Sequence, residues 1–332
     1  MNNRLITVVL VSLTVLFSAC GKRGSEKDSG KTTIAVIPKG TTHEFWKAIH
    51  AGAAQAAEEL GVELIWKGPL KEDDRDAQIS VVEDFVSLGV SGIVLAPLDE
   101  VALRAPVANA RRAGIPVVII DSDLKGGDFV SFIATDNYKG GQLAGEKLRE
   151  LLGGKGNVIM LRYQEGSAST ANREQGFLDA IAAAKGIVVK SSSQYGGPTT
   201  ETSYRSSENL LAPFKNAAGG LDIDGIFCPN ESTTFGMLRA LQDGGFAGKV
   251  RFVGFDSSTK LVEALGSGQL DGLVLQAPMK MGYLGVKTMV RHLKGEQVEK
   301  RIDTGVTLIT PANMNQPENM QLLRPDLSRW LK

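Results

Sequence analysis

Four polar side chains each come directly after a short apolar run of the sequence. Asp, Asn and Gln offer paired acceptors and donors, which suit neighbouring hydroxyl groups that donate one hydrogen bond and accept others. A polyol fits this chemistry. For any one of the four, capping of the next helix or the start of a turn stays an open alternative. The four side chains are those of Asp121 in PVVIID, Asn230 in GIFCPN, Asp256 in VRFVGFD and Gln276 in LDGLVLQ.

Arg173 is a candidate partner for these groups. It follows the segment EGSASTAN and is expected to open a helix that begins REQGF. Its guanidinium is a planar fork of fixed charge, so it could hold hydroxyl oxygens and offset the charge of the aspartates. A surface arginine in a first helical turn is the alternative interpretation.

Aromatic side chains supply a complementary apolar surface. The segment KGTTHEFWKAI places His43, Phe45 and Trp46 in the loop after the first apolar run or in the first turn of its helix. Flat rings can pack against the C–H face of a sugar and gain about 25 cal/mol per Å² of buried apolar area, while the hydroxyl edge stays free. For Phe45, packing between helix and sheet is the alternative.

The elements that must position these residues alternate along the first half of the chain. Short β-branched runs are separated by stretches of helical spacing, and continuous apolar strands between helices indicate a parallel sheet covered on both faces. The first half is therefore expected to be a doubly wound α/β lobe. Strands are expected at 34–38, 62–66, 92–97, 116–121 and 129–135, and helices at 48–60, 78–88 and 101–113.

The same pattern starts again in the second half, which predicts a second α/β lobe. Because no long Pro/Gly-rich linker separates the halves, we expect short crossings that permit hinged motion of rigid bodies. The carboxyl ends of parallel strands face the ligand crevice, so the four polar endings should share one cleft. Strands are expected at 157–162, 187–193, 225–230, 250–256 and 270–276, and helices at 173–184 and 232–242.

The first 20 residues have the composition of a secretory signal. Arg4 is followed by an apolar stretch at 5–17, which is shorter than the roughly 20 residues of a membrane-spanning helix. Ser18 and Ala19 before Cys20 resemble the lipobox of bacterial lipoproteins, so lipidation of Cys20 is expected. Ordinary cleavage or a buried cysteine is the alternative. Residues 21–32 are polar and Gly/Ser-rich, as in a flexible tether.

Composition argues against several other classes of protein. The 332 residues carry 37 basic and 37 acidic side chains without a basic block, which leaves no footprint for nucleic acid. Only three His are present, without an HExxH, CxxC or G-x-S-x-G motif, so an enzyme, a metal site and a cofactor are not expected. His43 and His50 could share a helical face but lack a third ligand. Cys228 is expected to be a buried free thiol.

Taken together, these residues resemble the ribose-type sugar-binding proteins of bacterial ABC transporters, over essentially the whole chain after the signal. That family has an aromatic pair after its first strand, matched here by Phe45 and Trp46. The remaining motifs follow in the family's order. They are Asp121 in VIIDSD, Arg173 in ANREQGF, Asn230 in IFCPNES, Asp256 in VGFD and the hinge-strand Gln276.

The sequence departs from the family at positions that would contact a ligand. Thr42, His43 and Glu44 stand where the family often has Asn residues and Pro, and Ser122 stands where ribose binders tend to have Arg. Ribose itself is therefore not predicted, whereas a monosaccharide or similar polyol is. The resemblance also makes Tyr195 a candidate for the opposing aromatic wall.

The resemblance implies a fold of periplasmic binding protein type I. Three strands are expected to cross between the lobes, near 135–137, 276–277 and 303–305. Residues 33–136 and 277–304 would form lobe 1, and residues 137–276 and 305–332 would form lobe 2. The lobes would close on a ligand that contacts both of them, because its binding energy then favours the closed state.

The function that this resemblance implies is extracytoplasmic sugar binding and delivery to an ABC permease. The protein would be a monomer in the periplasm or cell envelope, held to the membrane by lipid on Cys20. A ligand-presenting protein for a sensor or for chemotaxis, or a binder of another small solute such as a furanosyl signal molecule, is the alternative. Sugar-responsive repressors share the fold, but they need a DNA-binding helix-turn-helix where this chain has its signal segment.

Overall fold

The computed structural model describes residues 31–331, of which residues from Thr32 onward belong to one compact unit. The predicted signal segment, the lipidation at Cys20 and nearly all of the predicted tether lie outside the described residues. Within the described range, no helix has the length and apolar character needed to cross a membrane.

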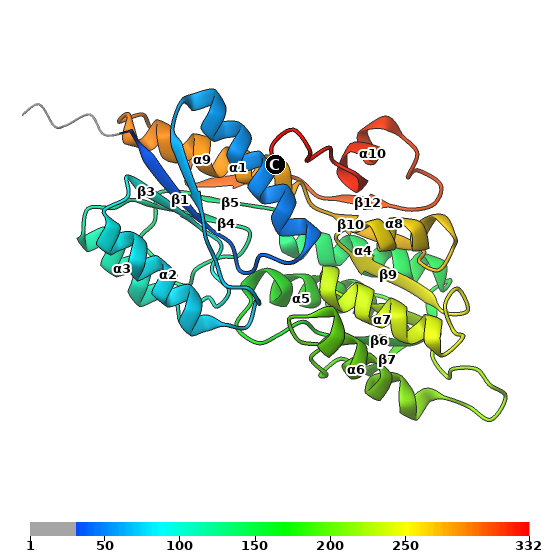
Figure 1. Ribbon diagram of the computed structural model, residues 1–332. Coiled ribbons are helices and arrows are strands. Elements are labelled where there is room, and N and C mark those ends of the chain that lie inside the picture. The colour runs from blue at the N-terminus through cyan, green and yellow to red at the C-terminus, as the bar shows by residue number, and fades with distance from the viewer. Residues whose placement is uncertain (1–30, 332) are drawn as a thin grey trace, which may run out of the picture. The chain divides into compact units, whose positions relative to one another are not determined.

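The first half of this unit, together with the late strand β11, builds a six-stranded parallel sheet in the order β11-β5-β4-β3-β1-β2. We call the part of the molecule built on this sheet lobe 1 (Figure 1). Its strands are β1 (Thr33–Ile37), β2 (Glu63–Trp66), β3 (Gly92–Leu95), β4 (Val117–Ile120), β5 (Phe132–Ala134) and β11 (Arg301–Asp303).

Helices cover both faces of the lobe 1 sheet, as the continuous apolar strands predicted. Ile34 and Val36 of β1 pack with α1 (Glu44–Leu60) and α9 (Pro278–Leu293). Their neighbours Ala35 and Ile37 point to the other face and pack with α2 (Arg75–Leu88) and α3 (Arg104–Arg112). Alternate residues of one strand thus enter two separate cores.

The second half repeats the architecture, and we call it lobe 2. Its sheet has the order β12-β10-β9-β8-β6-β7 and is parallel except for the antiparallel edge strand β12. The predicted two-lobed α/β fold is therefore confirmed. The strands are β6 (Lys155–Met160), β7 (Gly186–Ser191), β8 (Gly225–Phe227), β9 (Arg251–Phe255), β10 (Gly272–Leu275) and β12 (Thr307–Ile309).

The helices of lobe 2 also divide between the two faces of its sheet. One core includes Leu148 of α4 and Phe177 of α5, and the opposite core includes Leu211 of α6, Met237 of α7 and Leu261 of α8. The bounds are α4 (Asn137–Leu151), α5 (Ala168–Ala182), α6 (Thr200–Leu211), α7 (Glu231–Asp243), α8 (Thr259–Gly266) and α10 (Pro317–Leu323).

Both lobes contain helices whose backbones lie in very close contact. In lobe 1, a Cβ at Gly52 of α1 would overlap the carbonyl of Met279, and one at Gly282 of α9 would overlap that of Ile49. Lobe 2 repeats this arrangement where Gly141 of α4 meets the backbone of Arg173 in α5. Glycine allows these backbones to touch.

The chain passes between the two sheets three times, after β5, after β10 and between β11 and β12. The connecting segments are residues 135–136, 276–277 and 304–306. In Figure 1, the late helix α9 lies beside α1 in lobe 1, which shows the return of the chain after its course through lobe 2.

One helix boundary differs from the expectation in a way that matters for the site. Helix α5 begins at Ala168 and not at Arg173, so Arg173 lies in its second turn. The prediction of a loop over these residues was wrong because small polar residues suggest a turn. Here Ser169 and Thr170 are buried, and the Thr170 hydroxyl donates to the Ser167 carbonyl, so the segment is helical.

Candidate functional site

A cavity lies between the lobes at the carboxyl ends of both sheets. All the predicted site residues except Ser122 and Tyr195 line it. Its free volume is about 30 Å³, well below the 300 Å³ or more of typical ligand pockets, so a ligand enters only if the lobes move apart. The lining residues are Lys39, His43, Phe45, Trp46, Glu72, Asp121, Tyr163, Ser169, Thr170, Arg173, Asn230, Glu231, Asp256 and Gln276.

Asp121 and Asp256 occupy equivalent places in the two lobes. Asp121 follows β4 and Asp256 follows β9, each the third strand from its end of the sheet. Their φ angles are 63° and 66°, and within the described part of the chain they are the non-glycine residues with positive φ. This conformation costs about 1–2 kcal/mol for an L-residue. Such strain clusters at functional sites, where it aims a side chain.

In lobe 1, Asp121 is held by a buried cation. The Lys39 ammonium lies 2.8 Å from its carboxylate, and both side chains are almost fully buried. Lys39 also donates to Ser169 of lobe 2 at 3.1 Å and to Ser167 at 3.4 Å. The charges of Lys39 and Asp121 therefore neutralise each other, and Lys39 also contacts lobe 2.

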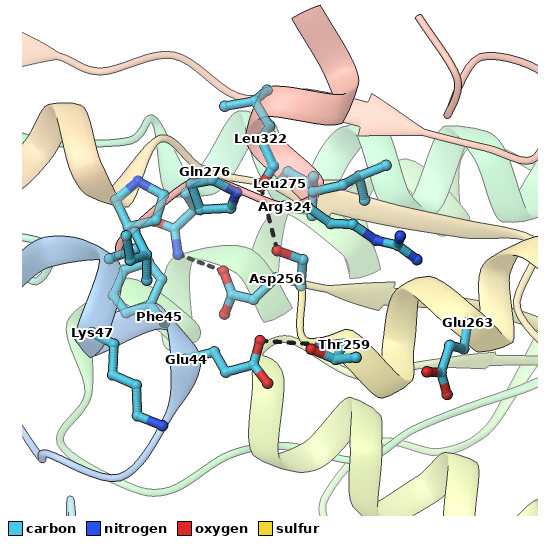
Figure 2. A pocket seen from close by; sticks show the side chains of 16 residues that line it. Glu44, Phe45, Lys47, Asp256, Thr259, Glu263, Leu275, Gln276, Leu322 and Arg324 are labelled. Atoms are coloured by element: carbon cyan, nitrogen blue, oxygen red, sulfur yellow. Dashed lines mark hydrogen bonds between the residues drawn. The ribbon is translucent and has the colours of Figure 1, made fainter. Parts of the chain in front are cut away.

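In lobe 2, Asp256 is held mainly by neutral donors. Its carboxylate accepts from the Gln276 amide at 2.8 Å, which Figure 2 shows, and from the Glu231 backbone N–H at 3.2 Å. Arg173 lies 3.8 Å away. Burial raises the pKa of Asp256, and the charge of Arg173 opposes that shift only in part.

Arg173 is buried and is fixed by groups of lobe 2. Its Nε donates to Asn137 Oδ1 at 2.8 Å, its Nη1 donates to the Pro229 carbonyl at 2.9 Å, and its guanidinium lies over the ring of Phe255. Its Nη2 has no partner, and neither has the buried Oε1 of Gln276. Such orphaned polar atoms are rare in folded proteins and call for an explanation. A hydroxyl group can accept from one and donate to the other.

The aromatic residues lie in the first turn of α1, as predicted. Phe45 and Trp46 meet edge to face, with ring centroids 5.0 Å apart. His43 is the residue before this helix, and its Nδ1 pairs with Glu72 Oε1 at 2.5 Å. Burial alone would lower the pKa of His43, but the charge and hydrogen bond of Glu72 outweigh it and raise the pKa to about 9.

Two glutamates bridge the lobes by accepting hydrogen bonds from helix N-termini. Glu231 of lobe 2 accepts from the backbone N–H groups of Glu44 and Phe45, at 3.2 and 3.1 Å. Glu44 of lobe 1 in turn accepts from the N–H of Thr259 at 3.1 Å (Figure 2). These carboxylates satisfy free N–H groups at the start of α1 and α8. Burial raises the pKa of Glu231 to about 7, against the charge of His43.

The groove in Figure 2 adjoins this cavity. It has a volume of about 490 Å³ and shares Phe45, Asp256 and Gln276 with the cavity. Its outer wall comes from the C-terminal segment, including Leu322 and Arg324.

Two of the predicted residues, Asn230 and Ser122, make structural contacts that the sequence pattern did not specify. The Asn230 side chain accepts from the N–H of Thr233 and caps α7, which is the alternative left open for it, while it also faces the cavity. Ser122 is buried and accepts from the Ser169 N–H of lobe 2 at 3.1 Å. Ser122 therefore joins the lobes beside the cavity and does not line it.

Tyr195 lies elsewhere, so we do not retain it in the site. It follows the edge strand β7, its side chain is 38% exposed, and the Arg162 guanidinium covers its ring at 4.7 Å. Tyr163, which follows the more central strand β6, lines the cavity instead.

Sequence reasoning missed several charged residues of the cavity. Lys39 follows the first strand and could have been found by the same strand-end rule. Glu231 is adjacent to Asn230. Glu72 lies in the run KEDDR, which has the composition of an exposed loop, and nothing in its spacing signals burial.

Outside the cavity, Cys228 and His50 have structural surroundings. Cys228 is a buried free thiol, as predicted, and burial raises its pKa well above the usual value. His50 stacks on Trp66, away from His43. Among residues 31–331, no cluster of three or more His, Cys, Asp or Glu could hold a metal ion.

Comparison with known proteins gives consistent matches. Residues 34–297 match the periplasmic binding protein domain. The ribose import binding protein RbsB of Haemophilus influenzae is 33% identical over 300 residues, which cover 90% of this chain and 99% of that protein.

Solved structures agree over a similar length. A carbohydrate transporter solute-binding protein from Agrobacterium radiobacter, in complex with D-arabinose, aligns with a TM-score of 0.83 and 33% identity over 89% of this chain and 99% of that chain. An ABC transporter solute-binding protein from Agrobacterium vitis with bound D-fucose has a TM-score of 0.81 and 36% identity, covering 88% and 100% of the two chains. The chain therefore belongs to the periplasmic binding protein family.

Proposed function

We propose that the protein binds a monosaccharide or similar polyol between its lobes and delivers it to an ABC importer. One observation carries this proposal: the buried donor Nη2 of Arg173 and the buried acceptor Oε1 of Gln276 both lack partners beside one cavity. A single hydroxyl group, or two neighbouring ones, would satisfy both atoms. Phe45 and Trp46 supply an apolar wall for the C–H face of a ring.

The ligands of the relatives support this class of solute. The relatives named above are a ribose import binding protein and solute-binding proteins in complex with D-arabinose and D-fucose, sugars that differ in the orientation of their hydroxyls. This chain places His43, Lys39 and Ser122 around the cavity. Because charged groups that are already paired add little affinity for a charged solute, an uncharged polyol fits this cavity best.

Ligand entry requires hinge motion. The cavity is too small for a sugar as the lobes now lie, and the three short connections at 135–136, 276–277 and 304–306 are the segments that could bend. A ligand that touches Phe45 of lobe 1 and Arg173 of lobe 2 gains energy only when the lobes close, so its binding favours closure.

The proposed location is the periplasmic side of a membrane. Lipid on Cys20 would hold the protein there as a monomer, and residues 21–32 would give the lobes reach towards a permease. The solute would be bound and released unchanged, without catalysis.

A thermal-shift screen tests the proposal. Pentoses, hexoses, deoxysugars and polyols are tested with wild type and with Asp256→Asn, because a ligand that binds only the folded state raises the melting temperature. We expect at least one polyol to raise it for wild type and much less for the variant. Amino acids and sugar acids serve as negative controls. A response to those alone, or an equal response of both proteins, would contradict the proposal.

A further inference from the structure

Glu72 is a buried carboxylate that the polyol contacts above do not use. It lies in the loop between β2 and α2 and is 6% exposed. Its side chain packs against the backbone of Gly40, where an added Cβ would lie 2.8 Å from the Glu72 Cγ. Glycine at position 40 therefore leaves the space that this carboxylate occupies.

Within lobe 1, Glu72 holds the start of α1. Its Oε1 accepts from the Trp46 indole N–H at 2.6 Å and pairs with His43 Nδ1 at 2.5 Å. The indole of Trp46 is nearly fully buried, and its only N–H is used in this bond. The carboxylate thus fixes the plane of one wall of the cavity.

Across the cleft, Glu72 binds lobe 2. Its Oε2 accepts from the hydroxyl of Tyr163 at 2.5 Å, and its backbone carbonyl accepts from the Gln164 amide at 2.8 Å. Tyr163 is 1% exposed and lines the cavity. One carboxylate therefore bonds to the aromatic wall of lobe 1 and to the opposite lobe.

The contact between Glu72 and Tyr163 lies far from the segments that connect the lobes, so it should resist their separation strongly. The chain passes between the lobes next to β5, β10, β11 and β12, at one end of each sheet order. Glu72 follows β2, at the opposite end of the lobe 1 sheet, and Tyr163 follows β6, next to the far edge of the lobe 2 sheet. A contact distant from a hinge separates most when the hinge opens.

Neighbouring groups stabilise the ionised form of the Glu72 carboxylate. Burial would raise its pKa, but the charge and hydrogen bond of His43, with Lys39 and Tyr163, outweigh burial and lower the pKa to about 2. Hydrogen bonds to an ionised acceptor are stronger than those between neutral groups.

We propose that Glu72 is a positioning residue that orients Trp46 against the ligand and, through Tyr163, latches the two lobes together on the side away from the hinge segments. The first role rests on the proposed function. The second depends only on the two-lobed architecture and on the contacts of this carboxylate.

Small-angle X-ray scattering of Tyr163→Phe, Glu72→Gln and wild type, without added solute, tests the latch. A hydrogen bond to a charged group shifts an equilibrium by roughly 10- to 150-fold, so loss of the Tyr163 hydroxyl should populate the open form and increase the radius of gyration. Tyr283→Phe is the matched control, because the Tyr283 hydroxyl donates to Glu59 at 2.7 Å within lobe 1. It should scatter as wild type does.

Unchanged radii of gyration for both Tyr163→Phe and Glu72→Gln would overturn the latch, as would an equal increase for Tyr283→Phe. If a polyol binds, its dissociation rate should rise about tenfold or more in Tyr163→Phe. Glu72→Gln should also weaken binding, and wild-type affinity in that variant would overturn the role in orienting Trp46. An increased radius of gyration in a protein that binds no polyol would leave the latch standing and refute the proposed ligand class.

Discussion

Asp121 and Asp256 end equivalent strands of two similar lobes with the same backbone strain, yet their surroundings differ. Asp121 forms a 2.8 Å ion pair with Lys39 of its own lobe, whereas Asp256 receives neutral donors and lies 3.8 Å from Arg173. The two lobes thus hold an aspartate in the same backbone conformation, and the neighbouring side chains give each aspartate different partners. We infer that Asp121 mainly stabilises the structure of the cavity through its pair with Lys39, and that Asp256 mainly contributes to ligand binding.

Removal of the cation from the lobe 1 pair should have the largest effect. Lys39→Met leaves Asp121 buried without a partner, and breaking a buried pair in this way costs about 3–5 kcal/mol of the free energy of unfolding. Urea denaturation measures the loss. The double variant Lys39→Met/Asp121→Asn should recover much of it, and an equal loss in single and double variants would show that Asp121 does not depend on Lys39.

Substitution of Asp256 in lobe 2 should affect polyol affinity more than the free energy of unfolding. Asp256→Asn removes the charge and keeps one side-chain oxygen, which can accept from Gln276 or from the Glu231 N–H but not from both in their present places. Polyol affinity should fall by about 1.5–3 kcal/mol, or roughly 10- to 150-fold. Because burial penalises the charge of Asp256, its removal should offset much of the lost hydrogen bond, so the variant should lose much less stability than Lys39→Met.

Calorimetry and urea denaturation on one preparation of Asp256→Asn give both quantities. The comparison between the lobes fails if this variant binds as wild type does, or if it loses as much stability as Lys39→Met.

The shared backbone strain can be measured without the carboxylates. Alanine and glycine both remove the side-chain charge, but only glycine adopts positive φ without cost, so each Asp→Gly variant should be about 1 kcal/mol more stable than the matching Asp→Ala variant. The difference should be similar at positions 121 and 256. Equal stabilities of the glycine and alanine variants at either site would show that its strain is negligible.

The sequence predicted the strand-end residues because a pattern along the chain determines where they lie. An apolar strand that ends in Asp121 or Asp256 must place that residue at the carboxyl edge of a parallel sheet. The two-lobed fold followed from the alternation of strands and helices, the family from the resemblance of its motifs, and both are confirmed.

Of the charged partners, Lys39 follows β1 and could have been found by the same rule. Glu72 could not, because it is a polar residue in a loop and its burial depends on segments far away in the chain that close over it. Tyr195 shows the reverse case, because an aromatic residue after an edge strand has the right type but the wrong place. Pairing between distant segments is a property of the folded lobes and not of local spacing.

The pH dependence of stability should reflect the buried groups Glu231 and His43 beside the contact between the lobes. Glu231, with a pKa raised from 4.5 to about 7, binds a proton more tightly in the folded state, so its stabilising contribution is full below pH 4.5 and is lost as pH rises through 7. His43 acts in the same direction, and its contribution is full below pH 6.5 and is lost as pH rises through about 9.

The free energy of unfolding should therefore fall between about pH 5 and 9, by at most about 1.4 kcal/mol per pH unit for each proton. Urea denaturation across this range measures the slope. Glu231→Gln should flatten the lower part of the curve and leave the upper part, which belongs to His43. A wild-type slope in Glu231→Gln would assign the lower part to another group.

The most direct test is a crystal structure of the protein with the polyol that the thermal screen selects. We predict a ring hydroxyl, or two adjacent ones, within hydrogen-bond distance of both Arg173 Nη2 and Gln276 Oε1, with the ring face against Phe45 or Trp46. A ligand bound outside the cavity, or one that leaves both of these atoms without a partner, would contradict the assignment of this cleft as the polyol site.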